Sequence, residues 1–265
     1  MKPFLSYMPL LSLLLAMIAL PLKADTSDTP EWQALKVTHF GDRPIRENAT
    51  DLLELEAPFR AEDAAIVPIA VRAKQPQRAD AYIQNIHIII DRNPMPYSAN
   101  FHLSPTLGTV DIATRVRVDR YTHIRAIAEM NDGSLHMVAA HVRAAGGCSA
   151  PAMKDAEAAI ARLGQMQMRM RQPTIGQPVQ AQVIISHPNY SGLQFDQQRR
   201  TYIPPHYVRT IDITFNGEAL IKFEAGISVS EDPSVRFVFT PETSGVLKAT
   251  AEDSKQDIFT TEQKI

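Results

Sequence analysis

The residue with the clearest chemical potential is Cys148, the only cysteine among 265 residues. It follows Gly146 and Gly147 and precedes Ser149-Ala150-Pro151, so no large side chain of its own segment can cover the sulfur. Paired glycines lack the Cβ atoms that restrict backbone dihedrals, and they raise the conformational freedom of a segment. We therefore expect Cys148 to carry an exposed thiol on a mobile arm formed by Gly146 and Gly147. A buried cysteine that packs as a small hydrophobic side chain is the alternative.

Two basic residues near the cysteine could tune its reactivity. Arg143 and Lys154 lie five and six residues from Cys148. Either would lower the pKa of the thiol if the chain folded back on itself, because a thiolate is stabilised by a nearby cation. The simpler interpretation is that both are solvated surface charges, so we assign neither a catalytic role.

Other groups of reactive residues give weaker signals. A single thiol excludes an intrachain disulfide and a zinc site of several cysteines. The eight histidines are scattered, and His187-Pro188 and Pro204-Pro205-His206 are typical of turns. Met166, Met168 and Met170 have a thioether spacing that could suit Cu(I), although packing in a core or linker is the simpler interpretation. We predict no metal site and no cofactor.

No motif in the sequence predicts an enzyme. There is no nucleophile elbow, glycine-rich phosphate loop or zinc-protease helix. An enzyme would need a cleft assembled from residues such as Asp91, His102 and His206, and no spacing brings these three together. We therefore predict no catalytic residues.

The elements that flank Cys148 show the period-two hydrophobicity of β-strands. Asp132-Gly133 and Asn216-Gly217 are favoured hairpin dipeptides. These patterns predict an all-β fold with two immunoglobulin-like β-sandwich domains. A helical turn is expected near Thr50 to Leu55, where Thr50 can cap the turn. The alternating segments are 67–71, 86–90, 112–118, 121–130 and 135–142 in the first half, and 179–185, 211–215, 220–223, 235–239 and 246–251 in the second.

Four segments follow from these patterns. Residues 1–24 resemble a cleavable secretory signal peptide, because Lys2 precedes an apolar run that is too short to span a bilayer. Residues 25–150 form the first sandwich and end in the Gly-Gly-Cys segment. Residues 151–172 form a linker with a short helix, since its apolar residues fall mostly on one helical face. Residues 173–265 form the second sandwich.

Charge and export limit the partners. The chain has 27 basic and 29 acidic residues and a formal net charge of −2, which disfavours binding to nucleic acid or to an anionic membrane. Removal of the signal peptide would leave a periplasmic protein without a membrane anchor. A lone cysteine in an oxidising compartment can also pair between two chains, so a dimer through Cys148 is one expectation.

The order of short motifs resembles the SoxYZ sulfur carrier family, with SoxY-like and SoxZ-like parts fused in one polypeptide. Single motifs are weak, but their order across two domains with Gly-Gly-Cys at the junction is specific. The SoxY-like residues are Ala64-Ala65-Ile66-Val67-Pro68-Ile69, Asp91-Arg92-Asn93-Pro94-Met95-Pro96, Thr114-Arg115-Val116-Arg117, Asp132-Gly133 and Gly146-Gly147-Cys148. The SoxZ-like residues are Ile185-Ser186-His187-Pro188, Ser191-Gly192, Ile203-Pro204-Pro205-His206-Tyr207-Val208, Asn216-Gly217 and Ala225-Gly226-Ile227-Ser228.

The resemblance implies a carrier that is not itself an enzyme. Cys148 would hold sulfur intermediates covalently, with thiosulfate joined as an S-thiosulfonate, and would present them to periplasmic sulfur-oxidising enzymes or cytochromes. Fused chains of this kind are similar to quinoprotein dehydrogenase-associated SoxYZ-like carriers, which implies a link to alcohol oxidation dependent on pyrroloquinoline quinone. The alternative is a noncovalent accessory protein that docks to such a dehydrogenase or its cytochrome.

One departure from the family pattern bears on the cysteine. In SoxY the arm ends the chain as Gly-Gly-Cys-Gly-Gly, whereas Ser149-Ala150-Pro151 and over a hundred further residues follow Cys148. A free end can enter a narrow channel as one extended strand, but an internal loop must enter two strands wide. We therefore expect Cys148 to reach only open or shallow sites on its partners.

Overall fold

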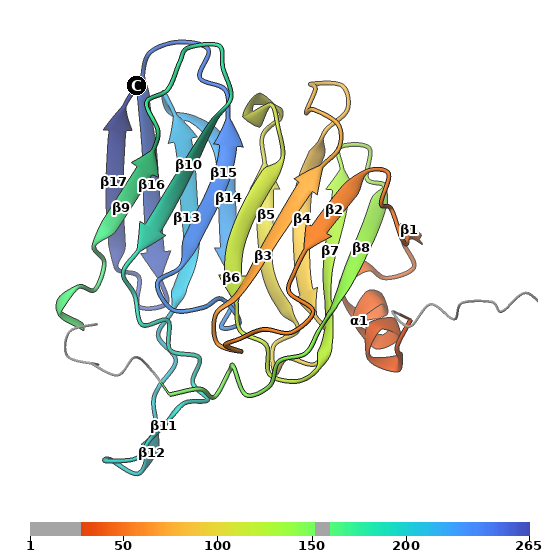
Figure 1. Ribbon diagram of the computed structural model, residues 1–265, viewed down its shortest axis with the longest axis vertical. Coiled ribbons are helices and arrows are strands. Elements are labelled where there is room, and N and C mark those ends of the chain that lie inside the picture. Colours follow the sequence, from red (N-terminus) through yellow and green to blue (C-terminus); the bar gives the residue numbers. More distant parts are fainter. Residues whose placement is uncertain (1–27, 152–159) are drawn as a thin grey trace, which may run out of the picture.

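The computed structural model describes residues 28–151 and 160–265, and it confirms the predicted all-β sandwich architecture (Figure 1). Two sheets stack face to face, with the six-stranded sheet in front of the nine-stranded sheet in Figure 1. Side chains that alternate along the strands point into the space between the sheets and form one large hydrophobic cluster. The alternation read from the sequence therefore corresponds to the buried face of each strand.

Residues 28–151 of the first half contain one helix, one 3-10 turn and eight strands. Helix α1 spans Pro30–Phe40 and the 3-10 turn η1 spans Pro105–Leu107. The strands are β1 Ile45–Arg46, β2 Leu53–Glu56, β3 Val67–Ala73, β4 Ile83–Ile90, β5 Tyr97–Leu103, β6 Asp111–Val116, β7 Thr122–Met130 and β8 Leu135–Val142.

In the second half, residues 160–265 contribute nine strands. They are β9 Met166–Met170, β10 Val179–Ile185, β11 Phe195–Asp196, β12 Thr201–Tyr202, β13 Val208–Phe215, β14 Glu218–Ala225, β15 Ser234–Phe239, β16 Val246–Asp253 and β17 Ile258–Lys264. Strands β11 and β12 form a separate two-stranded hairpin, which extends below the sandwich in Figure 1.

Both sheets run without interruption through the two halves of the chain. The large sheet has the order β1-β8-β7-β4-β5-β14-β13-β16-β17, and the smaller one β2-β3-β6-β15-β10-β9. The junctions are antiparallel pairs, with Phe101 of β5 opposite Phe223 of β14 and Ala113 of β6 opposite Arg236 of β15. The Phe101 and Phe223 rings stack with centroids 4.5 Å apart. The two halves are thus joined edge to edge by backbone hydrogen bonds and by a shared core.

One sequence-based expectation for local structure is wrong, and a second is confirmed only over residues 50–52. Met166–Met170 is strand β9, paired with β10, and not part of a linker helix. Its three methionines pack against the core, while Gln167 and Arg169 are exposed. In so short a segment, the positions of the apolar residues fit a helical face as well as a strand. The expected helical turn near Thr50 ends early, because β2 begins at Leu53. The predicted signal peptide and residues 152–159 of the predicted linker lie outside the described residues.

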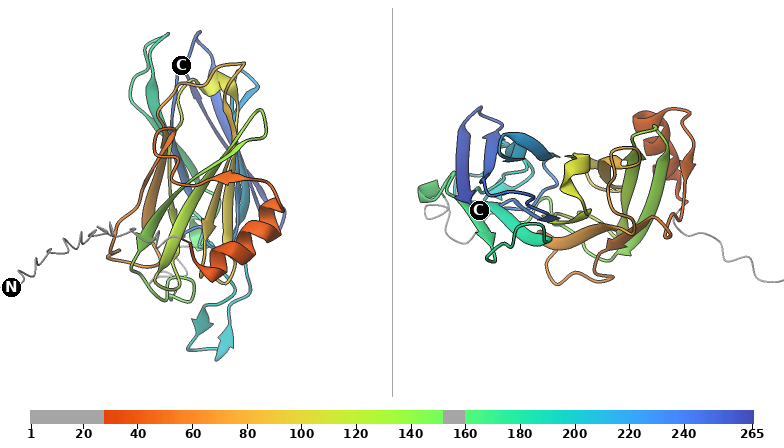
Figure 2. Two further views of the ribbon diagram at one scale, coloured as in Figure 1. Left: turned by 90° about the vertical axis from the view of Figure 1, so that its right-hand side faces the viewer. Right: turned by 90° about the horizontal axis from the view of Figure 1, so that it is seen from above.

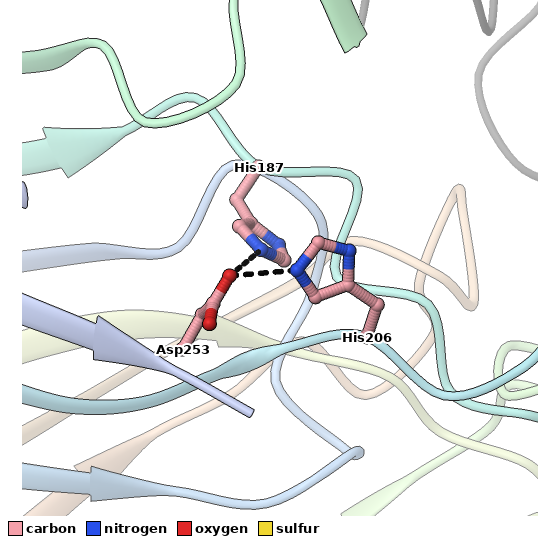
Figure 3. Close-up of side chains that lie close together, drawn as sticks. All are labelled: His187, His206 and Asp253. Atoms are coloured by element: carbon pink, nitrogen blue, oxygen red, sulfur yellow. Dashed lines mark hydrogen bonds and ion pairs between the residues drawn. The ribbon is translucent and has the colours of Figure 1, made fainter. Parts of the chain in front are cut away.

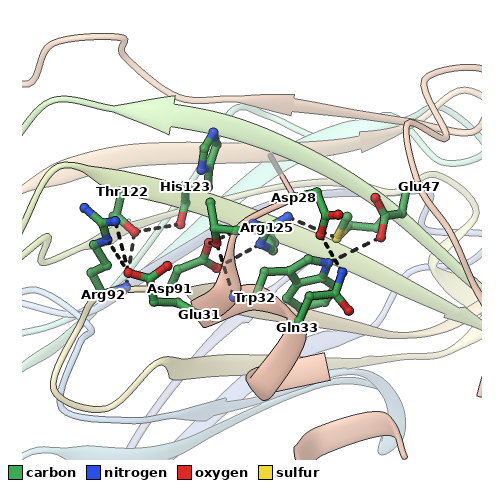
Figure 4. Close-up of polar contacts among 12 residues, drawn as sticks. Asp28, Glu31, Trp32, Gln33, Glu47, Asp91, Arg92, Thr122, His123 and Arg125 are labelled. Atoms are coloured by element: carbon green, nitrogen blue, oxygen red, sulfur yellow. Dashed lines mark hydrogen bonds and ion pairs between the residues drawn. The ribbon is translucent and has the colours of Figure 1, made fainter. Parts of the chain in front are cut away.

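Helix α1 was not predicted, and a buried charge network fixes it to the first half (Figure 4). The Thr29 hydroxyl caps its first turn. Trp32 is fully buried, and the guanidinium of Arg125 lies 4.4 Å from the centre of its ring. Arg125 also makes a bidentate ion pair with Asp91, with Nε to Oδ1 at 2.8 Å and Nη2 to Oδ2 at 2.7 Å. Within residues 28–151 and 160–265, no helix is long and apolar enough to cross a membrane.

Candidate functional site

Cys148 is fully buried, so the expectation of an exposed thiol on a mobile arm is wrong for this conformation. The residues from Gly147 to Ser149 form a turn that packs between the two halves of the chain. This turn itself has no large side chain to cover the sulfur, but elements distant in the sequence cover it.

Backbone hydrogen bonds hold the glycines in place. The N–H of Gly146 donates to the carbonyl of Asp119 at 2.9 Å, and the N–H of Gly147 donates to the carbonyl of Val118 at 3.0 Å. Both acceptors lie in the segment that follows β6. The arm predicted from Gly146 and Gly147 is therefore docked along this segment.

Close packing explains why Gly147 is a glycine. A Cβ atom built on Gly147 would lie 2.0 Å from the carbonyl oxygen of Ala64 and 2.8 Å from that of Val118. No side chain fits there without displacing backbone. Gly146 differs, because a Cβ atom would meet nothing within 4 Å, although its φ of +80° favours glycine. One glycine permits close approach and the other permits a turn.

The second half of the chain completes the enclosure. The hydroxyl of Ser191 donates a hydrogen bond of 2.6 Å to the carbonyl oxygen of Cys148. The hydroxyl of Ser230 donates to the carbonyl of Ala65 at 2.7 Å, next to the residue that contacts Gly147. The cysteine segment is thus clamped by both halves, and we call residues 144–151 the cysteine segment below.

Arg117 is the charged residue that matters most at this site, and it is nearly fully buried. Its Nη1 donates to the carbonyls of Val229 at 2.5 Å and Ile227 at 3.4 Å, which belong to a loop of the second half. Its Nε is buried without a hydrogen-bond partner. Burial lowers the pKa of Arg117, whereas the electrostatic influence of Cys148 and Glu231 raises it.

The surroundings of Cys148 keep its thiol protonated. Burial is the largest influence and, together with the charge of Asp119, raises the pKa of the thiol to about 12; Arg117 acts in the opposite direction. A thiol with such a pKa is a poor nucleophile near neutral pH, because only the thiolate reacts. If burial were relieved, Arg117 would remain as the group that favours the thiolate.

The sequence analysis placed Arg117 in a SoxY-like motif but did not connect it with Cys148. In the pattern of Ile112, Thr114 and Val116, Arg117 falls on the opposite, solvent-facing parity of the strand. The loop from the second half covers that position, and no local pattern could predict this contact. Arg143, which was considered instead, lies over the Phe59 ring at 4.6 Å. Lys154 lies outside the described residues.

The structure does not bring together the three residues considered for an enzymatic cleft, because each of them contacts a different partner. Asp91 pairs with Arg125, and His102 lies 3.1 Å from Glu224. His206 hydrogen-bonds to Asp253. No cleft formed by Asp91, His102 and His206 results.

A second cluster joins His187, His206 and Asp253, all buried, at one end of the second half (Figure 3). One possible ligand atom from each lies within 4.8 Å of the others, a spacing that could hold a metal ion. His187 follows β10, His206 precedes β13 and Asp253 ends β16. The sequence analysis had assigned both histidines to turns and had not connected them with Asp253.

The carboxylate of Asp253 already accepts several hydrogen bonds. Its Oδ1 accepts from the backbone N–H groups of Lys255 at 2.7 Å and Asp257 at 3.0 Å. Its Oδ2 accepts from His206 Nε2 at 2.6 Å. Although burial raises the pKa of Asp253, these hydrogen bonds together lower it below its usual value. The carboxylate therefore holds together a turn and a loop of the second half.

The protonation of His187 also opposes metal binding. The N–H of Asn189 donates to His187 Nδ1 at 3.0 Å, so a neutral His187 carries its proton on Nε2. This Nε2 points toward Asp253 Oδ2 at 3.6 Å and presents a proton rather than a lone pair. The donor set fits a structural His–Asp–His network better than a metal site.

This network predicts acid sensitivity. Burial and the neighbouring charge of His206 lower the pKa of His187 from 6.5 to about 4. Because the folded-state pKa lies below the unfolded value, this stabilisation is present above pH 6.5 and is lost as the pH falls toward 4. The loss for this group is about 3 kcal/mol of unfolding free energy. We expect His187→Asn, which keeps an acceptor for Asn189, to unfold with a weaker pH dependence than the parent protein.

Urea titrations at about pH 7 and about pH 4.5 measure this difference. His102→Asn is the matched control, because His102 is half-exposed beside Glu224. An unchanged pH dependence in His187→Asn, or an equal change in His102→Asn, would contradict the assignment.

Two family models match nearly all of the described chain. The model described as "Sulfur oxidation protein SoxY" matches residues 36–148, and the one described as "Sulphur oxidation protein SoxZ" matches residues 168–264. A two-part sandwich with a cysteine at the junction is thus one polypeptide made of a SoxY domain followed by a SoxZ domain. The chain belongs to the SoxY and SoxZ families, as a fused SoxYZ-like protein.

Two of the similar solved structures cover about two fifths of this chain, and a third covers most of it. The sulfur carrier protein SoxY from Chlorobium limicola f thiosulfatophilum shares 24% identity over 43% of this chain and 91% of its own, with a TM-score of 0.36. A superoxide reductase (neelaredoxin) from Ignicoccus hospitalis shares 14% identity over 37% and 94%, with a TM-score of 0.33. Fibronectin(III)-like modules of Clostridium thermocellum CbhA share 10% identity over 80% and 91%, with a TM-score of 0.24. No curated protein matches the chain.

Proposed function

We propose that this protein is a periplasmic carrier that holds a sulfur intermediate covalently on Cys148 and presents it to sulfur-oxidising enzymes or cytochromes. The observation that carries the proposal is that the SoxY match ends at residue 148, on the only cysteine of the chain. Members of this family are carriers rather than enzymes. The proposed carrier needs no cofactor beyond the sulfur adduct.

The described conformation represents the closed, unloaded state of this carrier. A thiol with a pKa of about 12 and no exposed surface cannot react with a partner. Loading therefore requires the cysteine segment to leave its place between the halves. Opening returns Cys148 to water, lowers the pKa of the thiol and breaks only a few hydrogen bonds, because the segment contributes no strand to either sheet.

The loading reaction needs an oxidising partner. When thiosulfate joins the thiol, a sulfur–sulfur bond forms, the thiol proton is released and two electrons leave. A redox protein such as a cytochrome must accept these electrons, since the described residues offer no second thiol. The resulting adduct is larger than a thiol and favours the open state, so loading and opening support each other.

The alternative candidate does not use the thiol and is therefore consistent with the burial of Cys148. In that case the protein is a noncovalent accessory of a quinoprotein dehydrogenase, and the cysteine is a packed core residue. The continuous sheets provide a rigid body for such docking. A dimer linked through Cys148 would require the same opening as loading does.

Intact mass spectrometry of the protein from cells grown with thiosulfate tests the proposal. We expect part of the protein to carry a sulfur adduct on Cys148 that a reductant removes. Cys148→Ser is the control and must remain unmodified. An unmodified thiol in all of the protein, together with an unchanged growth phenotype of a Cys148→Ser strain, would refute the carrier and support the noncovalent accessory. A doubled mass that a reductant halves would instead indicate a disulfide dimer.

A further inference from the structure

The outer face of the six-stranded sheet contains a groove of about 750 Å³ that crosses the junction between the two halves. The bottom of the groove is formed by small outward-facing side chains. Ala70 of β3 lies opposite Ala113 of β6, and Pro68 and Ser234 occupy neighbouring positions. Longer side chains beside them, such as Arg236 opposite Ala113 and Arg115 opposite Pro68, form the walls.

The walls carry a concentration of positive charge. Four arginines line the groove, and Glu56 is the single carboxylate among the lining residues that the structure describes. The sequence as a whole is slightly acidic, with a net charge of −2, so this local excess is not a consequence of composition. The four arginines are Arg72, Arg115, Arg169 and Arg236.

Neighbouring carboxylates neutralise only part of this charge. Arg72 pairs with Glu56 at 2.8 Å, and Arg236 lies 3.7 Å from Asp111. The hydrogen bonds of the other two arginines go to neutral oxygens. Arg115 Nη2 donates to the carbonyl of Asp232 at 2.6 Å, and Arg169 Nη2 donates to the side-chain amide oxygen of Gln167 at 2.9 Å.

We propose that this groove binds an acidic, extended segment of a partner protein. The arginines are spread from β3 to β9, which are four strand steps apart in the order β3-β6-β15-β10-β9. At ~4.8 Å per step this is roughly 19 Å, the length of roughly six extended residues. A single small oxyanion reaches only neighbouring arginines, whereas a row of carboxylates can meet all of them.

The groove is connected to the cysteine site through the hydrogen bonds of Arg115. Arg115 donates to the carbonyl of Asp232, and its own carbonyl accepts from the N–H of Ser230. The same loop supplies the Val229 carbonyl that binds Arg117. Arg115 therefore links the groove to the loop that also binds Arg117 near Cys148. The binding itself does not depend on the chemistry of Cys148, so it can be tested separately from the carrier proposal.

Fluorescence anisotropy with a labelled peptide of alternating Glu and Ala residues tests the groove on the full chain. A peptide with Gln in place of Glu is the neutral control. We expect the acidic peptide to bind and the neutral one not to bind. The double substitution Arg169→Gln and Arg236→Gln should weaken binding by about tenfold, the effect of losing two partly exposed ion pairs.

A matched pair of substitutions removes the same charge elsewhere. Arg199→Gln and Arg209→Gln change exposed arginines of the second half that do not line the groove. This variant should bind the peptide within about twofold of the parent protein. Absence of binding by the parent, or an equal loss in both double variants, would overturn the proposal. Displacement by sulfate that exceeds the effect of chloride at equal ionic strength would also overturn it, because it would indicate a small-oxyanion site.

Discussion

Gly147→Ala is expected to increase the rate at which a thiol reagent labels Cys148 by roughly 100-fold, equivalent to about 3 kcal/mol. The new methyl group would lie 2.0 Å from the Ala64 carbonyl oxygen, which is backbone and cannot rotate away. The cysteine segment must therefore leave its closed position. Labelling kinetics under native conditions, followed by mass spectrometry, measure the change.

Gly146→Ala is the matched control for this substitution. It adds the same methyl group two residues from the cysteine, at a position where nothing lies within 4 Å. Its positive φ alone costs about 1 kcal/mol, so labelling should accelerate only about fivefold. Circular dichroism should show an intact sandwich in both variants. Equal labelling rates for the two variants would show that Gly147 does not hold the segment closed.

Arg125→Met is expected to destabilise the protein by about 3–5 kcal/mol, because it leaves the buried carboxylate of Asp91 without its partner. Both side chains are almost completely buried, and their ion pair is bidentate. The substitution also removes the cation above Trp32, the only tryptophan of the chain. Urea unfolding followed by tryptophan fluorescence therefore reports both the stability of the protein and the docking of α1.

Two further variants separate the buried charge from general damage. Arg43→Met breaks a partly exposed ion pair with Glu129 and should cost less than about 1 kcal/mol. The double variant Asp91→Leu and Arg125→Met removes both charges and should recover much of the stability lost in Arg125→Met. If the double variant were no more stable than Arg125→Met, the loss would come from packing and not from the unpaired carboxylate.

The sequence predicted the β-sandwich architecture well, because buried and exposed faces alternate along single strands. Val179 to Ile185 shows this alternation clearly, and Val67, Ile69 and Val71 all face the core; both segments form strands where expected. Strand β9 and helix α1 were missed because neither has a hydrophobic period that identifies it clearly. A five-residue strand cannot be distinguished from a helical stripe by periodicity, and α1 has a weakly amphipathic sequence.

The candidate site was predictable in identity but not in environment. Cys148 stood out because it is unique and follows two glycines. Glycines can make a segment flexible, or they can allow the backbone to approach its neighbours closely. Only tertiary contacts show which of the two applies here. Ser191 binds the Cys148 carbonyl and Val229 binds Arg117, and both are more than forty residues from Cys148 in sequence. For the same reason the pairing of His206 with Asp253 had no local signal.

The carrier account depends on one property, which is that Cys148 becomes reachable without unfolding of the sandwich. Thiol labelling of the parent protein at increasing urea, below the unfolding transition, measures this most directly. We predict a measurable labelling rate without urea that hardly changes as urea is added, because a local opening exposes little surface. A rate that rises with the full urea dependence of global unfolding would contradict the account, since Cys148 would then react only in the unfolded chain.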